Sequence, residues 1–249
     1  MPKKMQAYNK SELENYFLTE EAKKLYQKKF LSKEQLQNIN AQLVQLKSNP
    51  NIFFRIGFFF LGSFLISTII SAFGLILFPL ISEDFEFIFF FYAIVAYIGL
   101  EVLVNMKFFR HGLDDAFLLT SQISFSIGIG ILTEAILPVL ITMLVLGVFF
   151  AIRFINTISA VIAFIGLVGI FFNLIVEHDV MPKFYLSFVG LILAILVYFF
   201  VVHLAKNQNF YSYFKTLDTV RVASLLLGYL SMNYLVVREL SESLMNLEI

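Results

Sequence analysis

The sequence predicts an all-α fold, a polytopic bundle of about seven transmembrane helices with a short cytosolic helical hairpin at its amino terminus. Of the 249 residues, 59% are hydrophobic and 14% are charged, whereas globular domains average about 45–50% and about 25%. Residues 53–204 are almost continuously apolar, in stretches of the roughly 20 residues that cross hydrocarbon. These continuous runs indicate helices, because the strands of a membrane barrel alternate apolar and polar positions.

The first 50 residues are polar and form the predicted arm, with no cleavable signal peptide of the usual form. Ser11 with Glu14, and Ser32 with Gln35, match the capping-box pattern of a helix start. We therefore expect two helices, from about Glu12 to Phe30 and from about Lys33 to Lys47.

The second of these helices has an apolar stripe. Its members recur at three- and four-residue steps, as on one face of a helix: Leu36, Ile39, Leu43 and Leu46. This amphipathic pattern predicts a hairpin that packs on itself or on the membrane surface. The alternative is a docking surface for a protein partner, spread over residues 11–47.

Beyond Pro50 the sequence contains seven candidate spans. They are Phe53 to Ile81, Phe85 to Val104, Asp115 to Thr133, Ala135 to Ala151, Phe154 to Val176, Phe184 to Leu204, and Val220 to Val237. The chain thus divides into an arm (1–50), a bundle (51–240) and a short tail (241–249). Spans three and four are separated only around Glu134 and are near the minimum length, so a buried hairpin that crosses incompletely is the alternative for them.

Basic residues predict the orientation, because Lys and Arg beside spans remain on the cytosolic side. Ten lie in the arm through Arg55, and six more lie in every second gap between spans: Lys107, Arg110, Arg153, Lys206, Lys215 and Arg221. The opposite gaps and terminus carry only Lys183 and Arg238. We expect a multi-pass protein of the bacterial inner membrane, with a cytosolic amino terminus and a periplasmic carboxyl terminus.

Small and hydroxyl-bearing residues recur along the spans. Four stripes stand out: Ser63, Ser67 and Ser71; Thr120, Ser124 and Gly128; Ser159, Gly166 and Asn173; and Ser187, Gly190 and Ala194. Small residues let membrane helices approach closely, so these stripes predict the bundle interior. The alternative is a polar path for an ion or small solute, lined by such hydroxyls with Gln122 and reaching Asn173 or Glu101.

Ionisable residues within spans are costly and are therefore candidates for function. Glu101 lies near the cytosolic end of the second span, one turn before Asn105, and Arg55 enters the first span at a similar depth. These positions predict an Arg55–Glu101 ion pair between the two helices. A proton-binding or substrate-binding carboxylate is the alternative for Glu101.

The loop between the second and third spans is the densest polar cluster, and it contains His111, Asp114 and Asp115. A histidine beside two carboxylates can bind a divalent ion or exchange protons. Two carboxylates are too few for a protein-made metal cage, however. We therefore expect Gly112 to end the second span and Asp114 or Asp115 to cap the third.

Several chemistries have no support in the composition. The chain contains no cysteine, which excludes disulfides, thiolate catalysis and cysteine-ligated metals. Its three histidines are scattered, without the short spacing of two ligands on one helix face. The net charge is zero, so nothing favours nucleic-acid binding. We predict no catalytic, cofactor or metal site.

The polar arm, with residues 30–35 (Phe-Leu-Ser-Lys-Glu-Gln) at its turn, is followed by a Phe- and Gly-rich first span. Over residues 20–80 this pattern resembles the bacterial membrane proteins grouped as domain of unknown function 2157. The resemblance implies an uncharacterised bacterial inner-membrane protein with a cytosolic helical preface, and it carries over no functional residues.

The lipid bilayer is thus one predicted partner, and the arm is the only part of the chain suited to water. We expect a membrane-embedded scaffold or sensor subunit that contacts protein partners through the arm, and not an enzyme. A small-solute or ion transporter is the alternative.

Overall fold

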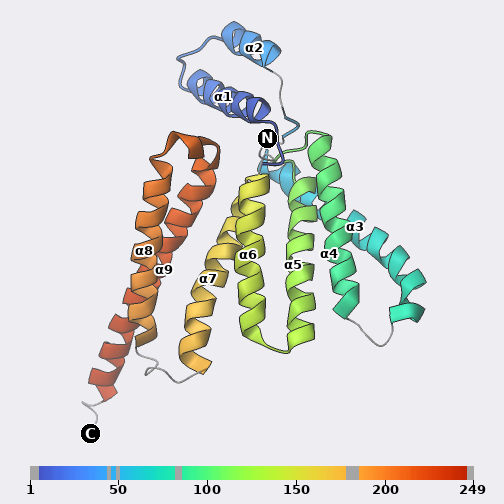
Figure 1. Cartoon of the computed structure of the whole chain (residues 1–249). Coiled ribbons are helices and arrows are strands. Elements are labelled where there is room, and N and C mark those ends of the chain that lie inside the picture. Colours follow the sequence, from blue (N-terminus) through green and yellow to red (C-terminus); the bar gives the residue numbers. More distant parts are fainter. Residues whose placement is uncertain (1–5, 44–45, 49–50, 82–85, 178–184, 246–249) are drawn as a thin grey trace. The chain divides into compact units, whose positions relative to one another are not determined.

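The computed structural model describes residues 6–43, 46–48, 51–81, 86–177 and 185–245. Within these ranges the chain is predominantly helical and has no strand, as predicted. The helices are α1 (Lys10–Gln27), α2 (Lys33–Gln42), α3 (Ile52–Ile81), α4 (Glu86–Asn105), α5 (Leu113–Thr133), α6 (Ile136–Phe154), α7 (Thr157–Glu177), α8 (Tyr185–Ala205) and α9 (Phe214–Met245), with a 3-10 helix, η1 (Gln208–Tyr213), before α9 (Figure 1).

Seven helices, α3 to α9, are long and apolar enough to cross a membrane. The chain is therefore a multi-pass membrane protein. The third and fourth spans, α5 and α6, have 21 and 19 residues and are joined by a tight turn in which Glu134 adopts the left-handed conformation, with φ 50°. Both helices reach full spanning length because this turn uses only two residues.

The last helix differs most from its predicted bounds. We predicted a span from Val220 to Val237, but α9 begins at Phe214 and extends to Met245, into the predicted tail. Its polar ends are helical because backbone hydrogen bonding continues past the apolar segment, while hydropathy marks only the part suited to hydrocarbon. Residues 246–249 of that tail lie outside the described ranges, as do Glu83, Asp84, His178, Asp179 and Lys183.

The two arm helices begin and end with local hydrogen bonds. Ser32 and Gln35 form the predicted capping box. The box predicted from Ser11 and Glu14 is wrong, because Asn9 caps α1 by accepting from the amide of Ser11. Lys29 (φ 63°) ends α1, with the amides of Lys29 and Phe30 bonded to the carbonyls of Tyr26 and Leu25 in a Schellman motif.

The predicted second helix is too long. α2 ends at Gln42, and Leu43 has extended backbone angles. Leu46 therefore leaves the apolar stripe and is buried at 4% exposure, while Lys47 forms a parallel bridge with Phe108. The stripe could not continue because the chain after α2 pairs with the α4–α5 loop.

The chain forms two compact units. Unit 1 is Met1–Leu132 with Ile152–Phe154, which are the arm, α3, α4, nearly all of α5 and the last turn of α6. Unit 2 is Thr133–Ala151 with Ile155–Ile249.

Small residues set the packing of unit 1. A Cβ added to Gly62 of α3 would lie 2.9 Å from the Cβ of Ala116 in α5. The buried face of α3 contains Gly62, Ile66 and Ile70. The predicted Ser63–Ser67–Ser71 stripe is wrong, since Ser67 is exposed and its hydroxyl donates to the carbonyl of Ser63 in its own helix.

Unit 2 shows the predicted close approach of helices at small residues. A Cβ on Gly147 of α6 would lie 2.7 Å from the carbonyl oxygen of Ser159 in α7, and one on Gly190 of α8 would lie 2.5 Å from the hydroxyl of Ser231 in α9. Ser187 and Ala194 share the buried face of α8 with Gly190. The interior of this unit is therefore held by backbone proximity.

Candidate functional site

The loop from Met106 to Gly112 joins α4 to α5 and is the most highly structured polar segment of unit 1. Lys107, with φ 67°, ends α4 in a Schellman motif, in which its amide and that of Phe108 bond to the carbonyls of Val104 and Leu103. The prediction that Gly112 ends this helix is wrong, because Lys107 takes that place. Gly112 directly precedes α5 instead.

Asp114 organises this loop. Its carboxylate accepts backbone hydrogen bonds from Arg110 (2.7 Å), His111 (2.9 Å) and Gly112 (3.0 Å). The side chain is therefore buried at 6% exposure without losing hydrogen-bond partners. The predicted capping of α5 is wrong, because Asp114 is the second residue of this helix and binds the amides of the loop before it.

Asp115, the next residue, pairs with Arg55 of α3. Nη2 of Arg55 lies 2.6 Å and Nε 2.8 Å from the same carboxylate oxygen. The Asp115 side chain is 5% exposed and that of Arg55 is 27% exposed. This pair links α3 to the start of α5.

Glu101 of α4 pairs with Arg153, in the last turn of α6. Nη2 and Nε of Arg153 lie 2.7 and 2.9 Å from one carboxylate oxygen, which also accepts a 2.8 Å hydrogen bond from Tyr97. The predicted Arg55–Glu101 pair is therefore wrong. Arg55 and Glu101 each pair with a residue of a helix whose position the sequence does not show. Asn105, one turn beyond Glu101, is exposed.

The arm is docked on this loop through aromatic rings. Phe109 is 1% exposed, and its ring centroid lies 5.0 Å from those of both Tyr8 and Tyr16, in edge-to-face geometry. The guanidinium of Arg110 lies 5.1 Å from the Phe109 ring and 6.0 Å from the Phe17 ring, within cation–π range. Phe109 thus inserts into the inner face of the arm.

Polar contacts surround this aromatic core at three places. The amide of Ala7 donates to the carbonyl of Arg153 at 2.9 Å. Lys107 binds Glu12 of α1 at 2.7 Å. Lys47 exchanges backbone hydrogen bonds with the loop, donating to Lys107 and accepting from Phe109. Both ends of the arm are therefore tied to the α4–α5 loop or to the end of α6.

Burial changes the titration of two groups at the docked surface. Burial raises the pKa of the Tyr8 phenol well above its usual value, and Asp114 and Asp115 add to this effect. Burial also lowers the pKa of His111. The His111 ring packs 4.3 Å from Phe58 and 4.8 Å from Phe108, and its Nδ1 is buried without a hydrogen-bond partner. His111 is therefore a neutral packing residue.

The other predicted polar candidates lie inside spans and are not brought together with the loop. Gln122 of α5 is 1% exposed, and both atoms of its amide lack a partner. Asn173 of α7 is half-buried, and its side-chain oxygen lacks a partner. Gln122 belongs to unit 1 and Asn173 to unit 2.

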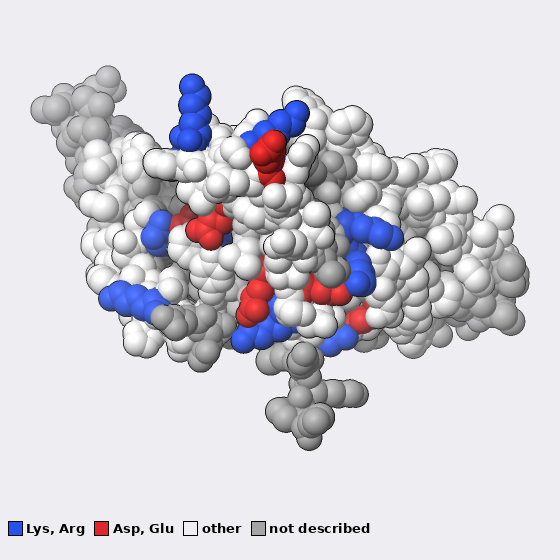
Figure 2. Space-filling view, turned by 90° about the horizontal axis from the view of Figure 1, so that it is seen from above, with Lys and Arg blue, Asp and Glu red and all other residues white. Residues whose placement is uncertain are grey.

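Figure 2, seen from above, shows basic and acidic side chains interspersed among uncharged residues. No group of three or more His, Asp or Glu in the described part of the chain is arranged to hold a metal ion. The site is thus a docking surface built from ion pairs and aromatic rings.

Sequence reasoning missed three central residues of this surface: Tyr8, Phe109 and Arg153. Phe109 stands out only as an apolar residue inside a polar loop, and the chain contains 31 phenylalanines. Arg153 is one of the basic residues that predict the orientation of the spans, but its ion-pair partner depends on how α4 and the end of α6 approach each other. No periodicity marks any of the three.

No protein-family model, curated protein or solved structure matches this chain. The resemblance of residues 20–80 to the domain of unknown function 2157 stays a prediction.

Proposed function

We propose that this protein is a non-catalytic scaffold or sensor subunit of the bacterial inner membrane, which presents its docked cytosolic arm to a protein partner. One observation carries the proposal. The inner face of the arm packs on the α4–α5 loop, while its outer face keeps large apolar side chains exposed. The arm is therefore held in place and still has a contact surface.

The inner and outer faces are distinct on α1. Leu13 is fully buried and Tyr16 contacts Phe109. Leu18 and Leu25 are 53% and 41% exposed. Leu18 is five residues beyond Leu13, which places it about 140° around the helix, and Leu25 lies nearly two turns further on the same side.

The end of α1 and the whole of α2 extend the outer face. Tyr26 and Phe30 are 40% and 75% exposed, and α2 has no buried residue. Exposed apolar groups on an ordered polar element are typical of protein-interaction surfaces. The ion pair between Lys107 and Glu12, and the bond from Ala7 to Arg153, connect this surface to the ends of the spans.

Photocrosslinking in living cells tests the proposal. A photoreactive amino acid replaces Leu18 or Leu25, and in a control it replaces Phe60 of α3, which is 67% exposed within a span. We expect a discrete protein adduct from the two arm positions and none from position 60. Adducts to lipid alone at the arm positions, or the same adduct from position 60, would contradict the proposal.

A transport function is the second candidate, and Gln122 favours it. A buried amide without a hydrogen-bond partner is unfavourable in a dry bundle. A solute or a row of water molecules that passes this position would explain why a glutamine is found there. Ser121 and Ser126 are buried on the same helix, but their hydroxyls donate to the carbonyls of Ala93 and Gln122. Of these three residues of α5, Gln122 is therefore the one whose side chain remains free for a solute.

The absence of cysteine from the sequence allows a direct test. Gln122→Cys would be the only thiol, so a membrane-impermeant thiol reagent reports water access at this position without background. We expect no labelling in intact vesicles, with Lys107→Cys in the exposed loop as the positive control. Rapid labelling of Gln122→Cys would favour transport over the scaffold function.

A further inference from the structure

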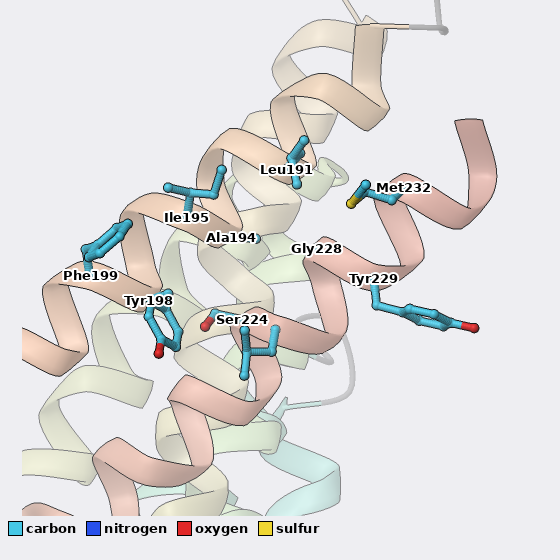
Figure 3. A pocket seen from close by; sticks show the side chains of 10 residues that line it. Leu191, Ala194, Ile195, Tyr198, Phe199, Ser224, Gly228, Tyr229 and Met232 are labelled. Atoms are coloured by element: carbon cyan, nitrogen blue, oxygen red, sulfur yellow. The ribbon is translucent and has the colours of Figure 1, made fainter. Parts of the chain in front are cut away.

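The two helices α8 and α9 of unit 2 pack along their lengths, and a groove follows one side of their seam. Its apolar part has a volume of about 280 Å³ and is lined by residues including Leu191, Tyr198 and Phe199 of α8 and Leu225, Gly228 and Met232 of α9 (Figure 3). Exposed apolar side chains form its rim, since Phe199 is 66% and Met232 57% exposed.

Small residues form the floor of the groove. Ala194 and Gly228 face each other across the seam (Figure 3), and a Cβ on Gly228 would lie 3.5 Å from the Cβ of Ala194. Larger side chains at these two positions would fill the depression. The groove therefore depends on the small size of these two residues, whereas the close approach of the helices occurs at Gly190.

A second cavity, of about 170 Å³, lies nearer the junction of the two helices. Val202 and Ala205 of α8 line it together with Lys206, the residue after this helix, opposite Leu217, Asp218 and Arg221 of α9. This end holds the only charged side chains among the residues that line the two cavities.

The two cavities lie on the same side of the helix pair. On α8, their lining residues follow one stripe of three- and four-residue steps from Leu191 through Tyr198 and Val202 to Ala205, and on α9 another runs from Leu217 through Arg221 and Leu225 to Met232. From Leu191 to Lys206 the groove covers about 22 Å at 1.5 Å per residue, whereas one leaflet of hydrocarbon is about 15 Å thick. The two cavities together thus follow a line that begins at the basic end and is longer than one leaflet is thick.

Charge identifies the headgroup that suits this end. Arg221 pairs with Asp218 through Nη2, which leaves the other donors of its guanidinium available. Lys206 is exposed and has no ion-pair partner among the described residues. Two cations against one carboxylate leave a net positive charge at the mouth of an apolar groove, which complements a phosphate.

We propose that the α8–α9 groove is a binding site for an anionic phospholipid of the cytosolic leaflet. One acyl chain lies along the floor at Ala194 and Gly228, and the phosphate and acidic headgroup lie between Lys206 and Arg221. The basic residues of this end belong to the set that predicts the cytosolic side, where anionic lipids attract Lys and Arg.

The chain contains no tryptophan, so a single introduced tryptophan reports the occupancy of the groove. Phe199→Trp places the fluorophore seven residues, or about 10 Å, from Lys206, at the depth of an acyl chain. The full-length variant is reconstituted in phosphatidylcholine vesicles that contain one lipid with brominated acyl chains. This brominated lipid is phosphatidylglycerol in one sample and phosphatidylcholine in the other. Phe60→Trp, on exposed α3, is the control for lipid contact without a groove.

We expect brominated phosphatidylglycerol to bind beside position 199 about 25-fold better than brominated phosphatidylcholine, the product of two fivefold factors. At position 60 the two lipids should quench the tryptophan equally. Lys206→Gln and Arg221→Gln should each reduce the preference about fivefold, the factor that corresponds to about 1 kcal/mol for each basic residue near the surface. Gly228→Leu should fill the floor and abolish the preference while α8 and α9 still pack.

Three results would overturn the proposal. Equal quenching by the two lipids at position 199 would mean ordinary annular lipid. A preference that survives both Gln substitutions would exclude the assigned headgroup contacts. Absence of quenching by either lipid would mean that protein, such as a second copy of the chain, covers the groove.

Discussion

Arg55 of α3 and Asp115 of α5 are joined by two hydrogen bonds that end on the same carboxylate oxygen, at 2.6 and 2.8 Å. The carboxylate is nearly buried, whereas the guanidinium is partly exposed. Arg55 does not pair with Glu101, the partner that the sequence suggested, so the observed pair shows how helix packing selects partners.

Asp115→Asn should destabilise the protein by about 1.5–3 kcal/mol, the range for a hydrogen bond to a charged group, because it leaves Arg55 without its anion. A double-mutant cycle with Arg55→Gln should show strong coupling, whereas Arg55→Gln and Glu101→Gln should be additive. Thermal unfolding in detergent measures both cycles. Coupling of Arg55 to Glu101 instead would contradict the observed pairing.

Gly112→Ala should destabilise the loop by about 2–3 kcal/mol. Gly112 has φ 109°, and an added Cβ would lie 2.2 Å from the carbonyl oxygen of Arg55. A strained backbone of this kind costs about 1–3 kcal/mol before the steric clash is included. Gly57→Ala is the matched control, because its Cβ would meet nothing within 4 Å in α3, and it should be neutral or slightly stabilising. Equal effects of the two variants would refute the close approach at Gly112.

Phe109→Ala should release the arm from the α4–α5 loop. The ring is almost fully buried between Tyr8 and Tyr16, and such truncations cost about 3–5 kcal/mol. The expected result is faster tryptic cleavage at the lysines of α1 while the spans remain intact. Phe30→Ala, at a position 75% exposed, should leave the cleavage rate unchanged. An arm equally resistant in Phe109→Ala would show that this ring does not hold it.

Acidification should weaken the protein through His111. Burial lowers the pKa of this imidazole from 6.5, so the unfolded chain binds the proton more tightly than the folded protein. The contribution of the neutral ring to stability is therefore present above about pH 6.5 and is lost as the pH falls through this value. Relative to His111→Gln, the wild type should lose stability between pH 7.5 and pH 5.5. A wild type that gains relative stability over this interval would show that His111 binds a proton in the folded protein.

The span prediction succeeded because it depends on length and hydropathy. The predicted bounds of α3 to α8 agree with the structure within three residues at each end, since helix formation in hydrocarbon is local. The prediction for α2 failed at Leu43 because Lys47, shortly after this helix, exchanges backbone hydrogen bonds with Lys107 and Phe109, which lie far away in the sequence.

The candidate site was predictable in part. Asp114 and Asp115 were identified as important for the start of α5, and Glu101 as a costly charge that needs a partner. The partners themselves were not predictable. Arg55 is near both Glu101 and Asp115 in depth, and only the rotation of α3 and the approach of the α6 end decide which carboxylate it meets.

By itself, the sequence determined that this chain forms a multi-pass helical membrane protein with a polar arm, because apolar length and backbone hydrogen bonding are properties of each segment. Only the tertiary structure decided that Phe109 inserts under the arm, that Arg153 reaches Glu101, and that Ala194 and Gly228 leave a groove. These features depend on the spacing and rotation of helices distant in the chain, which are set by the packing of many side chains together.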